Sequence, residues 1–168
     1  VWDDSTKFFR PRLNNGEFRE PFDPRAYHHE DFHDRDYVEG NAWQYLFFVP
    51  HDVYGLMDLM GGKDAFGNRL EELFNLPYIG ESTVGDVSGL IGDYAHGNEP
   101  CHHYAYLFCY AGRPWRTQEI VHEVDSKFYK AGPDGYIGNE DAGQMSAWYV
   151  FSAMGFYPVN PAGGIYII

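Results

Sequence analysis

The chain has 168 residues, with 25 Asp and Glu against 12 Lys and Arg, a formal net charge of −13 and an aromatic content of 18%. This length supports one domain with a substantial core, and the composition is that of a globular protein. The acidic balance and the absence of any Lys or Arg cluster exclude nucleic acid and anionic membrane surfaces as partners.

Turn-forming residues and aromatic anchors fill residues 1–36, so we expect irregular structure there. Gln44 stands where a capping box with Asn41 needs it, Pro50 ends the first helix, and Pro114 suits the first turn of another. No signal peptide opens the chain, and no apolar run reaches the length of a membrane span. Hydrophobic periodicity predicts helices at about residues 41–49, 51–60, 63–74, 84–91, 101–111, 114–128 and 144–156.

The predicted helices at 41–49, 101–111 and 144–156 lack charged residues, whereas those between them are amphipathic. Antiparallel hairpins built in this order start every buried helix at the same end. We therefore predict an all-α fold, a partial (α/α)6 toroid of the six-hairpin-glycosidase type, with a short strand in the closing residues 163–168. Because the helices are too few to close such a ring, we expect residues 1–168 to be a single domain, either an open arc or a fragment of a larger toroid.

An acidic cluster with Asn and Gly precedes each charge-free helix, at residues 38–41, 97–100 and 138–141. Free N–H groups and the positive end of the dipole make a helix start suitable for such a cluster. Gathered at one end of a helical domain, the three starts would form an acidic pocket floored with aromatic residues. This arrangement indicates carboxylate chemistry on a polar ligand, with or without a hard cation.

Cys101 and Cys109 are the two cysteines. On one helix their eight-residue separation places them about 12 Å apart, beyond the roughly 7 Å between Cα atoms that a disulfide tolerates. We expect both to be free thiols, and they leave the compartment of the protein undecided.

Five runs together resemble glycoside hydrolase family 92: YVEGNAWQY (37–45), VPHD (49–52), GNEPCHH (97–103), GRPW (112–115) and GNEDAGQMSAWY (138–149). The resemblance implies a bacterial, calcium-dependent α-mannosidase that inverts the anomeric centre. It also implies a longer polypeptide, in which an N-terminal β-sandwich and the first half of the toroid accompany this chain. The expected substrates are α-mannoside oligosaccharides of N-glycan or mannan type, and the expected location is periplasmic or secreted.

The same resemblance assigns the catalytic acid to Glu39 and the catalytic base to Asp141. An acid must keep its proton near neutral pH, so Glu39 should be desolvated, with Trp43 and Tyr45 near enough to dry it, or should lie beside another negative group. The alternatives are structural. Glu39 also fits a solvated residue before a helix cap, and Asp141 fits an N-cap with Gln144 as its capping-box partner.

Calcium takes six to eight oxygen ligands, and the resemblance assigns Asn98, Glu99 and Asp141 to it. A helix N-cap with an acidic first turn would explain Asn98 and Glu99 equally well. Binding of zinc is an alternative role for His102 and His103. Neighbouring side chains on a helix diverge by about 100°, however, which makes it difficult for the two to share one metal. The predicted substrate contacts are Trp43, His102, His103 and Glu140, with a core role as the alternative for each histidine.

Two functions follow from the sequence. The first is hydrolysis of α-mannosidic linkages, with this chain as one part of the enzyme. The second is a non-catalytic fragment or sugar-binding module that keeps the pocket but does not turn over substrate.

Overall fold

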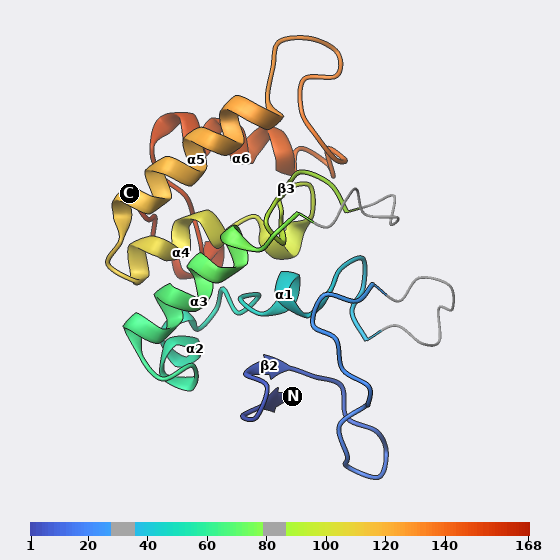
Figure 1. Ribbon diagram of the computed structural model, residues 1–168. Coiled ribbons are helices and arrows are strands. Elements are labelled where there is room, and N and C mark those ends of the chain that lie inside the picture. The colour runs from blue at the N-terminus through green and yellow to red at the C-terminus, as the bar shows by residue number, and fades with distance from the viewer. Residues whose placement is uncertain (28–35, 79–86) are drawn as a thin grey trace.

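The computed structural model describes residues 1–27, 36–78 and 87–168, and this part of the chain is mainly helical, as predicted (Figure 1). Two short antiparallel hairpins pair β1 with β2 and β3 with β4. The elements are β1 (Trp2–Asp3), β2 (Phe8–Phe9), α1 (Ala42–Tyr45), α2 (Val53–Leu59), α3 (Lys63–Asn75), β3 (Leu90–Ile91), β4 (Tyr94–Ala95), η1 (Glu99–Cys101), α4 (Tyr104–Tyr110), α5 (Pro114–Phe128), α6 (Gln144–Met154) and η2 (Pro161–Gly163).

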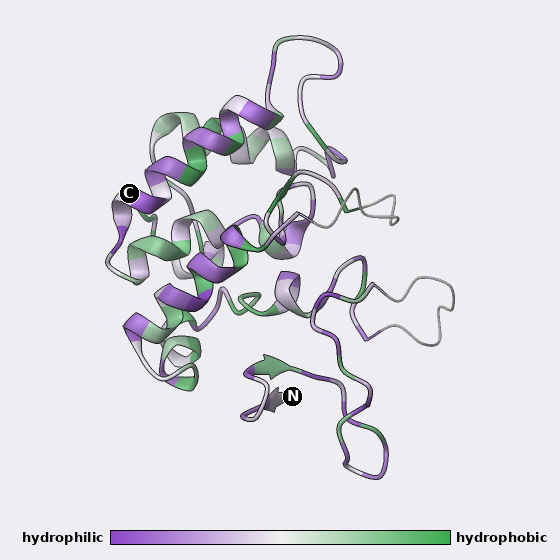
Figure 2. Ribbon diagram, in the orientation of Figure 1, coloured by the Kyte–Doolittle hydropathy of each residue, from purple (hydrophilic) through white to green (hydrophobic). Residues whose placement is uncertain are grey.

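Helices α3 and α5 are amphipathic, and their hydrophilic residues follow one side of each ribbon (Figure 2). Helix α5 begins with Pro114 in its first turn, as predicted, and buries Ile120 and Val124. Helix α3 buries Phe66, Leu70 and Leu73 in the same way. Each helix thus covers the core with one apolar stripe and presents charges to solvent.

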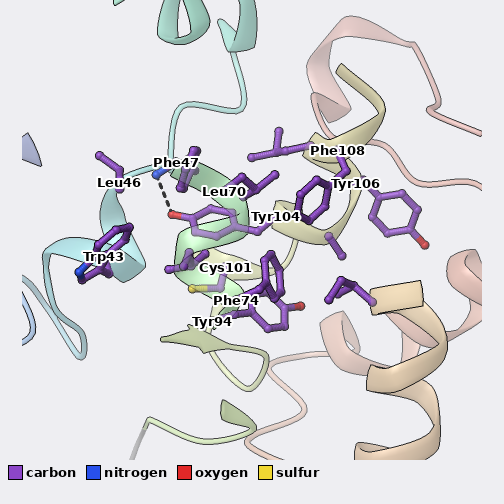
Figure 3. Close-up of a cluster of buried hydrophobic side chains, with 14 of the residues drawn as sticks. Trp43, Leu46, Phe47, Leu70, Phe74, Tyr94, Cys101, Tyr104, Tyr106 and Phe108 are labelled. Atoms are coloured by element: carbon purple, nitrogen blue, oxygen red, sulfur yellow. Dashed lines mark hydrogen bonds between the residues drawn. The ribbon is translucent and has the colours of Figure 1, made fainter. Parts of the chain in front are cut away.

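Helix α4 lies between α3 and α5 and is the centre of the core (Figure 1). Its residues Tyr104 to Phe108 are all buried. Figure 3 shows Tyr104 and Phe108 among side chains from α3, β4 and the segment after α1. Phe74 lies 5.6 Å from Phe108 and 4.8 Å from Tyr94 between ring centroids, so aromatic contacts join the helix to the β3–β4 hairpin.

The first predicted helix is shorter than expected, because α1 covers four residues of the run 41–49. The predicted capping box of Asn41 and Gln44 is confirmed at its start. At its end, the Tyr104 hydroxyl accepts from the Phe47 amide at 3.1 Å and donates to the Gln44 carbonyl at 2.7 Å. Side chains of a distant helix therefore satisfy backbone groups that a longer helix would have paired.

Three further expectations need correction. Residues 87–91 of the predicted helix 84–91 contain strand β3, because Gly89 and Gly92 on either side have φ of +68° and +60°; the rest of that prediction lies outside the described residues. Near the C-terminus a single bridge, Tyr157 with Ile167, stands in place of the expected strand. The N-terminal region is not wholly irregular, since β1 and β2 pair there.

Helix α6 is also less buried than its sequence predicted. Met145, Trp148 and Ser152 face the core, whereas Tyr149, Val150 and Met154 are exposed. Both cysteines are free thiols, as expected.

Candidate active site

The starts of the three charge-free segments meet at one place. The Asn98 side-chain amide, before η1, donates to the Glu39 carbonyl, before α1, at 3.1 Å. The side-chain amide of Gln144, at the start of α6, hydrogen-bonds Nδ1 of His102 at 2.7 Å. This convergence is what the alternation of buried and amphipathic helices predicted.

Both predicted catalytic residues have left-handed backbones. Glu39 has φ of +50° and Asp141 has φ of +49°, and Ala142 follows at +59°. In the described part of the chain, Lys7 is the one other non-glycine residue with positive φ. Such a conformation costs an L-residue about 1–2 kcal/mol, and strain of this kind concentrates at functional sites. Both residues that the motifs assign to catalysis are therefore among the four non-glycine residues with positive φ in the described part of the chain.

The turn that carries Glu39 is held from several sides. The Tyr45 hydroxyl donates to the Val38 carbonyl at 2.6 Å, and Gly40 is buried against the Tyr45 ring. Burial raises the pKa of Tyr45, and the nearby carboxylates of Glu39 and Glu99 add to this effect. Tyr45 therefore anchors the turn through its hydroxyl.

An ion pair that sequence reasoning missed supports the same turn. Arg25 donates to both oxygens of the buried Asp93 carboxylate, at 3.0 and 2.5 Å. Asp93 in turn accepts from the Asn41 side chain at 3.3 Å. No local pattern links residues so far apart in the sequence, so no signal in the chain could have found this support.

Glu99 interacts electrostatically with the other two carboxyls. Burial raises the pKa of Glu99, and the neighbouring Asp141 and the charge of Glu39 raise it further. Three carboxyl groups from three helix starts thus lie close enough to interact. Two carboxyls in contact at neutral pH need either a shared proton or a cation between them.

Asn98 supplies the observation that tests a cation at this place. Its Oδ1 atom is buried and has no hydrogen-bond partner among the described residues. An unpaired buried oxygen beside two carboxyls fits the oxygen chemistry of calcium. No cluster of three or more His, Cys, Asp or Glu in the described ranges has metal-binding geometry, so backbone oxygens, water or ligand hydroxyls would have to complete the shell.

The histidines near the site are buried and neutral. His103 hydrogen-bonds the Phe47 carbonyl at 2.9 Å, which is the core role. His102 bonds Gln144 through Nδ1, while its Nε2 has no hydrogen-bond partner by distance and angle in the described chain. Burial lowers the pKa of His102 and of His103 to about 4, and that of His96 to about 3. Of the predicted pair, His102 is the one whose buried Nε2 lacks a hydrogen-bond partner among the described residues.

Trp43 and Glu140 contact residues other than the predicted catalytic carboxyls. Trp43 is 3% exposed, stands edge-on to Phe8 at 5.0 Å and has the Arg69 guanidinium 4.0 Å from its ring centroid. It therefore does not dry Glu39, which is exposed. Glu140 accepts from the amide and hydroxyl of Ser146 at 3.0 and 2.8 Å and so caps the first turn of α6. Substrate contact by either residue stays a prediction, and the burial of Trp43 does not favour it.

A cavity of about 710 Å³ lies between α5, α6 and the segment 129–136. None of the predicted site residues lines it. The predicted catalytic residues thus lie at the helix starts, apart from this cavity.

The whole chain, residues 1–168, matches the profile of the glycosyl hydrolase family 92 catalytic domain. It is 32% identical over 166 residues to an uncharacterized secreted glycosidase of the fungus Arthroderma benhamiae, covering 96% of this chain and 20% of that protein. This chain belongs to glycosyl hydrolase family 92.

Two solved structures from Bacteroides thetaiotaomicron resemble it. A family GH92 α-mannosidase in complex with mannoimidazole has a TM-score of 0.88 and 44% identity, over 98% of this chain and 22% of that one. A family GH92 inverting mannosidase has a TM-score of 0.71 and 38% identity, over 92% and 21%. The chain therefore spans about a fifth of the length of these relatives. Within the described ranges, no helix combines the length and apolarity needed to cross a bilayer.

Proposed function

We propose that this chain is the part of a calcium-dependent, inverting α-mannosidase that carries both catalytic carboxyls. The observation that supports this most is that Glu39 and Asp141 both have a strained backbone and both lie near the same segment. The two residues are distant in sequence, yet each has a left-handed backbone and each adjoins the Asn98–Glu99 segment. Membership of the family adds the reaction type, because two related structures are mannosidases and one of these is an inverting enzyme.

In the proposed reaction, Glu39 gives its proton to the glycosidic oxygen as the bond from that oxygen to the anomeric carbon breaks. Asp141 takes a proton from a water molecule whose oxygen bonds to the same carbon from the opposite face. An inverting pair needs its carboxyls roughly 6.5–9.5 Å apart to leave room for that water. Asp141 also lies near Glu99, so the base and the proposed calcium ligands belong to one site.

Asn98, Glu99 and Asp141 are the proposed calcium ligands. The unpaired Asn98 Oδ1 and the contact between the two carboxyls support this, since a divalent cation would satisfy the first and neutralise the second. When bound, calcium would supply positive charge and coordination positions for sugar hydroxyls. We propose that this chain forms part of an (α/α)6 toroid and that the whole protein is secreted. Its substrates are α-mannoside oligosaccharides of N-glycan or mannan type.

The test is hydrolysis of an α-mannoside by the protein in its full natural length. EDTA should abolish the activity and Ca²⁺ should restore it. Proton NMR of the early reaction should show the β-anomer as first product. Glu99→Gln should weaken calcium binding, whereas Glu119→Gln on the exposed side of α5 should leave it unchanged. Activity indifferent to EDTA, or an α-anomer as first product, would refute the proposal.

The alternative is a sugar-binding module without turnover. The exposed apolar residues of α6 favour it for the 168-residue chain by itself, because a face of this kind is normally covered in an active domain. A mannosidase assay of this chain beside the full-length protein separates the two. Activity in both would remove the alternative, and sugar binding without turnover in both would establish it.

A further inference from the structure

Two glycines from different loops touch each other directly beside the proposed site. A Cβ added to Gly138 would lie 2.9 Å from the Cα of Gly97 and 3.0 Å from its carbonyl oxygen. Real Cβ atoms do not approach that closely, so the two backbones are in contact without any side chain between them. Gly138 has φ of +79°, which also favours glycine there.

Ser88 closes the other side of Gly97. The Gly97 amide donates to the Ser88 carbonyl at 3.0 Å, at the open end of the β3–β4 hairpin. A Cβ added to Gly97 would overlap the Ser88 Oγ atom. That hydroxyl is buried and has no hydrogen-bond partner among the described residues, so its role is to fill space. Gly97 is thus enclosed between Ser88 and Gly138.

Each glycine stands just before one of the proposed calcium carboxyls. Gly97 is followed by Asn98 and Glu99, and Gly138 is followed within three positions by Asp141. A loop held by backbone contact has little freedom to slide, because packed interiors resist changes of even one methyl group. The distance between the two loops therefore sets the distance between the two carboxyls.

We propose that Gly97 and Gly138 are positioning residues, whose contact holds Glu99 and Asp141 at the spacing needed to bind a cation and a water molecule. This inference rests on the proposed function for its purpose, though not for its geometry. It predicts that a side chain added at Gly97 increases the distance between the two carboxyls. Removing the Ser88 hydroxyl, which the added side chain would overlap, should restore that distance.

The experiment uses Gly97→Ala and the double variant Gly97→Ala with Ser88→Ala, in the full-length protein. Alanine at 97 overlaps Ser88 Oγ, whereas in the double variant the nearest remaining atoms are the Ser88 carbonyl oxygen at 3.2 Å and the Gly138 Cα at 3.4 Å. Calcium affinity from isothermal titration calorimetry should fall at least about tenfold in the single variant. It should return to within about threefold of wild type in the double variant.

Ser88→Ala alone and Gly155→Ala are the matched controls. The Ser88 hydroxyl has no partner to lose, so calcium affinity should not change. Gly155 at the end of α6 has φ of +83° and no atom within 4 Å of an added Cβ, so alanine there strains the backbone without touching the contact. A loss of affinity in Gly155→Ala equal to that in Gly97→Ala would show that affinity follows general stability, and would overturn the proposal.

Crystal structures supply a readout that does not depend on calcium or activity. The separation of the Glu99 and Asp141 carboxyls should widen in Gly97→Ala and recover in the double variant. If wild type neither binds calcium nor cleaves mannosides, the proposed function fails, while this separation still decides the positioning role. Should Gly97→Ala not fold, Ser88→Thr adds a single methyl to the side chain beside Gly97. An unchanged carboxyl separation in the variant that folds would overturn the proposal.

Discussion

Helices α4 and α6 carry the same kind of sequence and differ in what surrounds them. Each is free of charged residues and follows an acidic cluster, and their starts meet through His102 and Gln144. The first five residues of α4 are all buried, in a core shared with α3, α5 and the segment after α1. Helix α6 buries one side and exposes Tyr149, Val150 and Met154. A helix sequence without charges therefore indicates that the helix can pack on all sides. How much of its surface is buried depends on the neighbouring elements that are present.

The comparison also separates two roles within each helix. The bodies of α4 and α6 provide apolar packing, which the neighbours can change. The short segments that precede them carry Glu99 and Asp141, which interact with each other. Substitutions at the starts should therefore act on chemistry, and substitutions in the bodies should act on stability.

The largest effect is expected at the helix starts. Asp141→Asn should lower kcat by about 10²–10⁴-fold on every α-mannoside, because water activation is needed whichever group leaves. Glu39→Gln should be selective, with severe loss on poor leaving groups and much less on an activated aryl mannoside, which needs little protonation. Steady-state kinetics on both substrate types measures the difference.

Asp58→Asn on the exposed side of α2 is the matched carboxyl control and should retain full activity. Circular dichroism should show that all three variants fold, since each substitution is nearly isosteric and none removes a helix cap. Equal impairment of Glu39→Gln on every leaving group would contradict its role as the acid.

A smaller effect should separate the two helix bodies. Leu107→Ala in α4 removes a side chain that is 1% exposed and should cost about 3 kcal/mol of unfolding free energy. Met154→Ala in α6 removes one that is 59% exposed and should stay within about 0.5 kcal/mol. Urea unfolding of the 168-residue chain measures both.

The same pair in the full-length protein sharpens the comparison. If the rest of the polypeptide covers α6, the cost of Met154→Ala should rise above about 1.5 kcal/mol there, because a buried methionine contributes more than an exposed one. A cost that is the same in both forms would mean that this face of α6 remains exposed.

Local signals were sufficient for the starts of several helices. Asn41 with Gln44 and the proline at 114 each satisfy or avoid a backbone N–H within one turn, so sequence alone could place them. The end of α1 was not predictable, because Tyr104 and His103 from another helix take over its backbone groups. What a distant side chain will satisfy depends on the finished fold.

The site shows the same division. The shared direction of the charge-free helices predicted that Glu39, Glu99 and Asp141 would gather. The left-handed backbones at Glu39 and Asp141 were not predictable, since a non-glycine residue gives no local sign of positive φ. The ion pair of Arg25 with Asp93 was likewise hidden, because its partners meet only once the N-terminal segment has packed.

The pH dependence of stability should follow the histidines near the start of α4. Burial lowers the pKa of His102 and His103 to about 4, from 6.5 for an exposed imidazole. Below pH 6.5 the unfolded chain therefore binds protons that the folded chain does not, so stability is complete above 6.5 and falls as the pH drops toward 4. At pH 5 the loss should be about 2 kcal/mol for each histidine.

Urea unfolding at pH 7 and pH 5 measures this loss. His103→Gln should reduce the difference between the two pH values by about 2 kcal/mol, because glutamine does not titrate. Gln118→Ala, at an exposed position of α5 that does not titrate, should leave the difference unchanged. Comparing variants cancels the contributions of the carboxyls, and an equal effect of the two substitutions would contradict the burial argument.

The smallest effect concerns the strained backbone before α6. Ala142 has φ of +59°, a conformation that costs an L-residue about 1–2 kcal/mol and glycine very little. Ala142→Gly also gives the unfolded chain more freedom, which offsets about 0.4–1 kcal/mol of the gain. The net result should be a stabilisation of up to about 1 kcal/mol in urea unfolding. Ala147→Gly, at an exposed position inside α6, should have the opposite sign and destabilise by about 1 kcal/mol.

The opposite signs of these two alanine substitutions make the test independent of any general effect of glycine. If the strain at Ala142 serves to aim the Asp141 carboxylate, Ala142→Gly should gain stability and weaken calcium binding by a few-fold at the same time. Strain that has no functional purpose would be relieved without any change in calcium affinity. Destabilisation by Ala142→Gly would show that the left-handed conformation carries no cost there, which would remove strain as a marker of this site.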